Sequence, residues 1–219
     1  MLNIRREVFN AYQENTYIIS LGDAPEAVIV DPGCASNEER DRLLKRLADA
    51  GLKPAAVLLT HAHPDHIGGV KTLQERYGVK TYMCEAERTV FSLDFPTTAV
   101  EDGQTITAGG IEFEVITTPG HTPGGVCWLA RKYGALFTGD TLFAGSIGRT
   151  DFLYSEYDDE IRSIMEKIIL LDPDIRIFPG HGPTSTIGQE RTGNPFLEPF
   201  NEPEETTDPD LEPVVIHGE

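Results

Sequence analysis

Thr60-His61-Ala62-His63-Pro64-Asp65-His66 is the stretch from which the fold and the chemistry of this chain can be inferred. It follows the apolar run Ala55–Leu59, which is typical of a buried strand. Residues two apart in a strand point to the same side, so the first two histidines are expected to face one ion. The proline ends the strand, and the aspartate and third histidine fall on the first turn of the next element. Four metal-binding side chains within six residues predict a metal site.

Three further apolar strands end in residues of the same kind: Ile111–Thr117 precedes His121, Ala135–Thr138 precedes Asp140, and Ile175–Phe178 precedes His181. Ligands often bind beyond the carboxyl ends of strands in layered α/β proteins, so we expect these side chains to converge. The full set is His61, His63, Asp65, His66, His121, Asp140 and His181. Seven ligands exceed what one tetrahedral ion uses, whereas two ions that share one carboxylate use all of them. Imidazole and carboxylate without thiolate suit zinc, iron or manganese.

The remaining pattern predicts two similar halves. A hairpin is expected from Thr16–Leu21 and Ala27–Asp31, and helices from residues 37–50, 70–77 and 156–171. Further strands are expected at 80–83 and 126–130. The segment Glu85–Thr98 fits either a helix edge or a loop over the site. This doubled strand–helix plan predicts an α/β fold with two half-sheets packed together and helices outside.

Composition narrows the function classes. Among 219 residues, 36 acidic and 18 basic residues give a net charge of -18, which disfavours nucleic acid and anionic membranes as partners. Eight of the acids lie in residues 198–219, a stretch without Lys or Arg. We therefore expect a domain over 1–197 and an acidic tail over 198–219, in which residues 214–216 have the composition of an edge strand.

The three cysteines, Cys34, Cys84 and Cys127, are widely spaced and are expected to be small buried side chains in a reducing compartment. No run reaches the roughly 18 apolar residues of a membrane span. The N-terminal residues lack the apolar region of an export signal. The expectation is a cytoplasmic protein.

The ligand order His-x-His-x-Asp-His, then His121, Asp140 and His181, resembles the metallo-β-lactamase superfamily, whose fold is a four-layer αβ/βα sandwich. The resemblance runs from about Thr16 to Pro195. It implies that His61, His63 and His121 hold one metal, that Asp65, His66 and His181 hold a second, and that Asp140 bridges them. It also implies that Asp31, in an Asp-Pro-Gly turn, braces the site.

Several strings are similar to the compact glyoxalase II-like (hydroxyacylglutathione hydrolase-like) branch. They are Asp140-Thr141-Leu142-Phe143, Gly148-Arg149-Thr150-Asp151, Pro179-Gly180-His181-Gly182-Pro183, Thr186-Ile187-Gly188 and Asn194-Pro195-Phe196. The resemblance implies a hydrolase that uses two divalent ions, zinc above iron or manganese, on a small S-lactoylglutathione-type thioester. Asp65 is expected to orient the nucleophile while ligating, and Arg149 to brace the site or to contact a substrate carboxylate. Tyr154 and Tyr157 are expected either to line the pocket or to have ordinary surface or core roles.

Other functions fit parts of the same pattern. Persulfide dioxygenases share this fold and a Gly-Arg-Thr-Asp string, and they hold a single iron through residues matching His61 or His63, His121 and Asp140. Lactonases and β-lactamases share the ligands, and a non-catalytic metal-binding module is a further alternative. Metal analysis together with assays of thioester hydrolysis and of persulfide-dependent oxygen uptake separates these classes.

Overall fold

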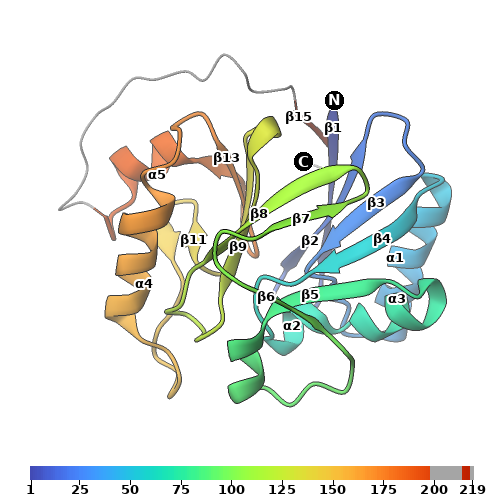
Figure 1. Cartoon of the computed structure of the whole chain (residues 1–219), viewed down its shortest axis with the longest axis horizontal. Coiled ribbons are helices and arrows are strands. Elements are labelled where there is room, and N and C mark those ends of the chain that lie inside the picture. Colours follow the sequence, from blue (N-terminus) through green and yellow to red (C-terminus); the bar gives the residue numbers. More distant parts are fainter. Residues whose placement is uncertain (198–213, 218–219) are drawn as a thin grey trace.

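The computed structural model describes residues 1–197 and 214–217, and two large mixed sheets lie at its centre (Figure 1). The first sheet has the order β15-β1-β2-β3-β4-β5-β6. Its strands are β1 (Leu2–Phe9), β2 (Glu14–Leu21), β3 (Glu26–Val30), β4 (Lys53–Leu58), β5 (Lys80–Cys84), β6 (Thr98–Val100) and β15 (Val214–His217). Strands β1 to β3 are antiparallel neighbours, whereas β3 to β6 run parallel to one another. The parallel half therefore delivers several strand ends to one edge.

The second sheet has the order β14-β13-β10-β9-β8-β7. Its strands are β7 (Thr105–Ala108), β8 (Ile111–Thr117), β9 (Val126–Ala130), β10 (Ala135–Gly139), β13 (Arg176–Pro179) and β14 (Ser185–Thr186). A small hairpin of β11 (Leu142–Phe143) and β12 (Ser146–Ile147) follows β10. Because β10 and β13 are parallel neighbours, the residues that follow them lie together.

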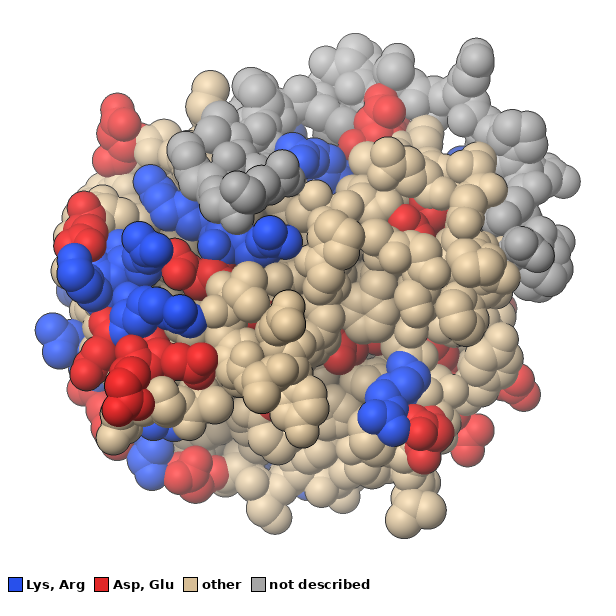
Figure 2. Space-filling model, turned by 180° about the vertical axis from the view of Figure 1, so that it is seen from behind, with Lys and Arg blue, Asp and Glu red and all other residues tan. Residues whose placement is uncertain are grey.

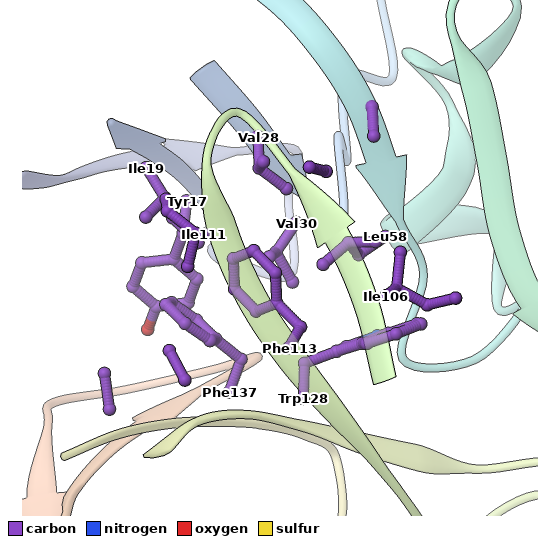
Figure 3. Close-up of a cluster of buried hydrophobic side chains, with 14 of the residues drawn as sticks. Tyr17, Ile19, Val28, Val30, Leu58, Ile106, Ile111, Phe113, Trp128 and Phe137 are labelled. Atoms are coloured by element: carbon purple, nitrogen blue, oxygen red, sulfur yellow. The ribbon is translucent and has the colours of Figure 1, made fainter. Parts of the chain in front are cut away.

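The facing sides of the sheets enclose the main apolar core (Figure 3). Strand alternation determines which side chains enter it: Tyr17 and Ile19 of β2 point inward, whereas Ile18 points to the opposite face. The Tyr17 ring meets Phe137 edge-on at 5.4 Å, and its hydroxyl donates to the Pro179 carbonyl at 2.7 Å. The one tryptophan, Trp128, is fully buried and donates to the Leu59 carbonyl at 3.0 Å. Both polar aromatic groups are thus satisfied inside the core.

Helices cover the outer faces (Figure 1). Helix α1 (Asn37–Asp49) and helix α3 (Val70–Tyr77) bury leucines against the first sheet. Helix α4 (Tyr157–Ser163), the π-helical turn η3 (Ile164–Ile168) and helix α5 (Ile187–Gly193) cover the second sheet. The result is the predicted four-layer αβ/βα sandwich of an α/β fold.

Several elements differ from the sequence-based expectation. Strand β1 was not predicted, because Leu2–Phe9 carries too many charged residues to resemble a buried strand, although Leu2 and Ile4 enter the core. The helix expected over 156–171 changes to a π-helical turn at Ile164. Segment 85–98 forms a short 3₁₀ helix η1 (Glu85–Thr89) followed by a loop, and is not a regular helix.

Strand β4 ends at Leu58, so the expectation that His61 and His63 share a strand face was wrong. The chain leaves the first sheet at Thr60, whose N–H donates to the Asp31 carboxylate at 2.8 Å. The Thr60 carbonyl accepts from Val126 N–H of the second sheet at 2.8 Å. The two histidines are therefore brought together by this crossing loop.

Residues 214–216, whose composition is that of an edge strand, lie in β15, which runs parallel to β1 with Leu2 opposite Val214. Residues 198–213 and 218–219 of the expected acidic tail lie outside the described residues. All three cysteines are free, with Cys34 and Cys127 buried and Cys84 half-buried. None of the helices in the described part of the chain is long and apolar enough to cross a membrane. On the face shown in Figure 2, Lys and Arg gather mainly at one side, with Asp and Glu directly beside them.

Candidate metal centre

The ends of β4, β8, β10 and β13 meet at one edge of the sandwich, and all seven predicted ligands lie there. The crossing loop after β4 carries the first two histidines, and the short helix α2 (Pro64–Ile67) carries Asp65 and His66. His121, Asp140 and His181 come from the loops after the other three strands. Gly68, at the end of α2, has no room for a side chain, because a Cβ atom there would lie 2.2 Å from the Cys34 carbonyl oxygen.

Four residues form the first group of potential ligands: His61, His63, His121 and Asp140. Nδ1 of His63 lies 3.0 Å from Nε2 of His61 and 3.0 Å from Nε2 of His121. Nε2 of His121 lies 3.6 Å from Oδ2 of Asp140. Tetrahedral ligands about 2.05 Å from one ion lie about 3.3 Å apart, so these separations fit one ion.

The second group contains Asp65, His66 and His181. Nε2 of His66 lies 3.3 Å from Nε2 of His181 and 3.4 Å from Oδ1 of Asp140. Nε2 of His181 lies 3.4 Å from Oδ2 of Asp65. Asp140 therefore stands between the two groups, and the His/Asp cluster as a whole fits a dimetal site.

Asp140 supplies a second indication of fit. Its Oδ1 atom is buried without a hydrogen-bond partner among the described residues. A buried carboxylate oxygen without a partner costs free energy, which coordination of a cation would remove. Gly180 packs so closely against this oxygen that a Cβ atom would lie 2.3 Å from it.

The imidazole tautomers follow from the hydrogen bonds of the opposite ring nitrogens. His66 Nδ1 donates to the Asp31 carboxylate at 3.1 Å, and His121 Nδ1 donates to the Arg149 carbonyl at 2.7 Å. His181 Nδ1 donates to the Tyr12 carbonyl at 3.0 Å. Because Nδ1 of each ring carries the proton that is donated to these acceptors, the Nε2 atoms face the site with a free lone pair.

The other two histidines follow the same rule. Thr60 Oγ1 donates to Asp31 at 2.6 Å and so accepts from Nδ1 of His61 at 3.0 Å. Nε2 of His63 lies 2.9 Å from the Tyr154 hydroxyl, which leaves its Nδ1 atom for the site. Every one of these five histidines thus has one nitrogen fixed by a protein group and one directed at the cluster.

Electrostatics differ between the two groups. Burial lowers the pKa of His61 and His121, and it lowers the pKa of His63 to about 4, so these imidazoles are neutral at neutral pH. Burial also disfavours charge on His66, but Asp140 and Asp31 outweigh it and raise its pKa to about 10. Without metal, a proton on His66 balances the carboxylates near it, and a bound cation would take the place of this proton.

A cavity of about 640 Å³ opens over the cluster. One wall is aromatic: Phe152 stacks on Tyr154 at 5.4 Å, and Phe91 meets Tyr154 edge-on at 5.3 Å. Arg149 lies over the Phe152 ring at 4.5 Å, and the exposed Tyr12 also lines the cavity. An apolar wall with one cation suits a small organic anion.

Of the two tyrosines with open roles, Tyr154 lines the cavity, whereas Tyr157 is an exposed residue at the start of α4. At Arg149 the backbone carbonyl, and not the guanidinium, contacts His121, and the expected role of the side chain stays a prediction. The sequence interpretation missed Phe152 and Tyr12 in the cavity and the buried carboxylates of Glu87 and Glu160 beside the ligand loops. A lone glutamate in a sequence has no spacing signal that would reveal its burial.

The fold and the paired His/Asp groups define the class of metallo-hydrolases to which the comparisons also assign this chain. The family model of the metallo-beta-lactamase superfamily matches residues 10–181, and the chain belongs to this superfamily. It is similar to the hydroxyacylglutathione hydrolase GloC of Haemophilus influenzae, with 35% identity over 213 residues, which cover 90% of this chain and 98% of that protein.

Two solved structures show the same fold. The crystal structure of the BLEG-1 B3 metallo-beta-lactamase has a TM-score of 0.82 and 34% identity, covering 90% of this chain and 100% of that chain. The crystal structure of TTHA1623 in a di-iron-bound form has a TM-score of 0.77 and 32% identity, covering 88% of this chain and 99% of that chain.

Proposed function

We propose that this protein is a binuclear metal-dependent thioester hydrolase that acts on small S-acyl substrates of the S-lactoylglutathione type. The observation that carries the proposal is the position of Asp140, whose Oδ2 lies 3.6 Å from His121 Nε2 and whose Oδ1 lies 3.4 Å from His66 Nε2. One carboxylate thus faces both ligand groups. The similarity to a hydroxyacylglutathione hydrolase supports the thioester as the substrate.

In this proposal His61, His63 and His121 hold one ion, Asp65, His66 and His181 hold the other, and Asp140 bridges them. Zinc suits these ligands, and the di-iron form of TTHA1623 supports iron as an alternative. Two divalent ions bound here would lower the pKa of a water molecule and polarise a carbonyl oxygen.

The protein's own groups have separate tasks. Burial raises the pKa of Asp65, but its hydrogen bond with His181 and the nearby His66 outweigh burial and lower the pKa to about 2, so this carboxylate is ionised in the metal-free protein. Its carboxylate can accept a hydrogen bond from the attacking water and so orient it. A thiolate leaving group departs without a general acid, because its pKa is low compared with that of an alcohol.

Substrate binding is assigned to the cavity wall. The Arg149 guanidinium is 63% exposed at the rim, where it pairs with Asp151 at 2.6 Å and stacks on Phe152. A substrate carboxylate would replace Asp151 as the acceptor of the two parallel hydrogen bonds that the Arg149 guanidinium donates. Phe91, Phe152 and Tyr154 would contact the apolar part of the thioester. All these residues lie in the range 1–197 proposed as the hydrolase domain.

A mononuclear iron persulfide dioxygenase is the second candidate. The observation that favours it is that His61, His63, His121 and Asp140 form a complete four-ligand group on their own. The close approach of Asp65, His66 and His181 favours two ions instead, since a single-ion site has no use for three further ligands.

One experiment separates the two candidates. Purified protein is analysed for metal content, and hydrolysis of S-lactoylglutathione is measured beside oxygen uptake on glutathione persulfide and hydrolysis of a chromogenic β-lactam. Two metals per chain with thioester hydrolysis support the proposal. One iron per chain with oxygen uptake and no hydrolysis would overturn it.

A further inference from the structure

Glu87 is a fully buried carboxylate that joins the two loops carrying the three histidines of the first ligand group. Its Oε2 atom accepts the N–H of Ala62 at 2.7 Å, and its Oε1 atom accepts the N–H of Gly124 at 2.8 Å. Ala62 lies between His61 and His63, and Gly124 lies three residues after His121. The Glu87 side chain thus links a loop of the first sheet to a loop of the second sheet.

We propose that Glu87 is a positioning residue for the first metal, setting the spacing of His61, His63 and His121 through these two backbone hydrogen bonds. The inference rests on the proposed metal-binding function of those histidines. It assigns to Glu87 a task that involves no contact with substrate or metal.

The geometry requires a carboxylate of this length. Both oxygens accept from backbone N–H groups that point at them from opposite loops, and ionised acceptors make the stronger hydrogen bonds. Gly124 allows the close approach, because a Cβ atom at this position would lie 2.6 Å from the Glu87 backbone nitrogen. Burial raises the pKa of Glu87, and the Thr122 side chain together with the two N–H donors opposes this shift.

The same element also shapes the cavity. Glu87 lies in η1, and its carbonyl accepts the N–H of Phe91 at 2.9 Å. The Phe91 ring in turn meets the His63 ring edge-on at 5.3 Å. The segment that fixes the ligand loops therefore also places one aromatic group of the cavity wall.

Two variants test the role. In Glu87→Gln an NH₂ group faces one of the backbone N–H donors, and in Glu87→Asp the carboxylate is too short to reach both loops. The control Glu85→Gln changes an exposed residue of the same 3₁₀ helix. The control Glu190→Gln changes another buried carboxylate. Glu190 accepts the N–H of Gly145 at 2.8 Å and hydrogen-bonds to none of the candidate ligands.

Stepwise zinc affinities are measured by competition with a chromophoric chelator, and the visible spectrum of the cobalt-substituted protein reports the geometry of the bound ions. For both Glu87 variants we expect one of the two affinities to fall at least about tenfold, the other to stay within about threefold, and the cobalt spectrum to change. Glu190→Gln should lower the melting temperature without either effect, and Glu85→Gln should resemble the wild type.

Glu87 variants that bind both metals with wild-type affinity and an unchanged spectrum would overturn the inference. So would two Glu87 variants that fail to fold while Glu190→Gln folds, because the role would then be purely structural. A wild-type protein that binds no metal would instead refute the proposed function, so the two failures are distinguishable.

Discussion

Nδ1 of His121 lies 2.7 Å from the carbonyl oxygen of Arg149. The backbone of Arg149 therefore orients a proposed ligand, whereas its guanidinium points to the cavity rim over Phe152. The two parts of one residue have separable tasks, and a side-chain substitution changes only one of them.

For Arg149→Ala we expect unchanged metal content and a KM about 10- to 100-fold higher for an anionic thioester. The reason is the loss of a charge-assisted hydrogen bond, worth about 1.5–3 kcal/mol. Steady-state kinetics and metal analysis measure both quantities. Arg162→Ala, which removes another exposed arginine paired with a nearby aspartate, is the matched control. An unchanged KM would exclude the substrate contact.

Asp140→Asn should remove both metals together with activity. The amide is neutral and places an NH₂ group toward one ligand group, so the variant can no longer bridge two cations. Elemental analysis of the purified variant measures the loss, and Asp151→Asn, on the exposed rim, controls for a lost aspartate charge. Full metal content in Asp140→Asn would reject the bridging role.

Asp31→Asn should weaken metal binding about 10- to 100-fold, the usual range for a residue that orients a ligand. The Asp31 carboxylate accepts from Thr60 N–H at 2.8 Å and from His66 Nδ1 at 3.1 Å. An amide NH₂ directed at His66 would favour the tautomer with the proton on Nε2, the atom needed by the metal. Chelator competition measures the affinity, with Asp49→Asn, at an exposed position of α1, as the control. Wild-type affinity in Asp31→Asn would contradict the tautomer argument.

Glu160 predicts a pH dependence of stability in the metal-free protein. Its carboxylate accepts the His121 N–H at 2.8 Å, but burial outweighs this bond and raises its pKa to about 8 from 4.5. Between pH 4.5 and about 8 the folded state therefore binds more protons at Glu160 than the unfolded state does. The stability that comes from protonated Glu160 is lost as pH rises toward 8. The slope from one group is at most about 1.4 kcal/mol per pH unit.

Glu160→Gln should remove that slope, so the unfolding free energy of the variant minus that of the wild type should increase from about pH 5 to about pH 8. Urea denaturation of the metal-free proteins at several pH values measures it. Glu156→Gln, an exposed glutamate directly before α4, should show a constant difference. A constant difference for Glu160→Gln as well would show that Glu160 does not titrate as expected.

The sequence predicted the elements whose pattern is regular. Strands such as Ile111–Thr117 and Val126–Ala130 are found with the expected bounds, because their apolar character reflects burial between layers. Strand β1 escaped detection because three consecutive charged residues, Arg5–Glu7, separate the core side chains Leu2 and Ile4 from Phe9. The π-helical turn at Ile164 is also absent from the sequence pattern, since its residues have the same apolar periodicity as an α-helix.

The sequence by itself determined the fold class and the seven candidate ligands, because His and Asp residues at strand ends form a pattern that needs no coordinates. Only the tertiary structure decided how they meet. His61 and His63 face one point because the loop after Leu58 crosses between the sheets, anchored by Asp31, and not because they share a strand. The tautomers depend on carbonyls of Tyr12 and Arg149, which approach their histidines across 169 and 28 residues of sequence. Every residue has a backbone carbonyl, so the residue types in the sequence do not show which carbonyls will accept these hydrogen bonds.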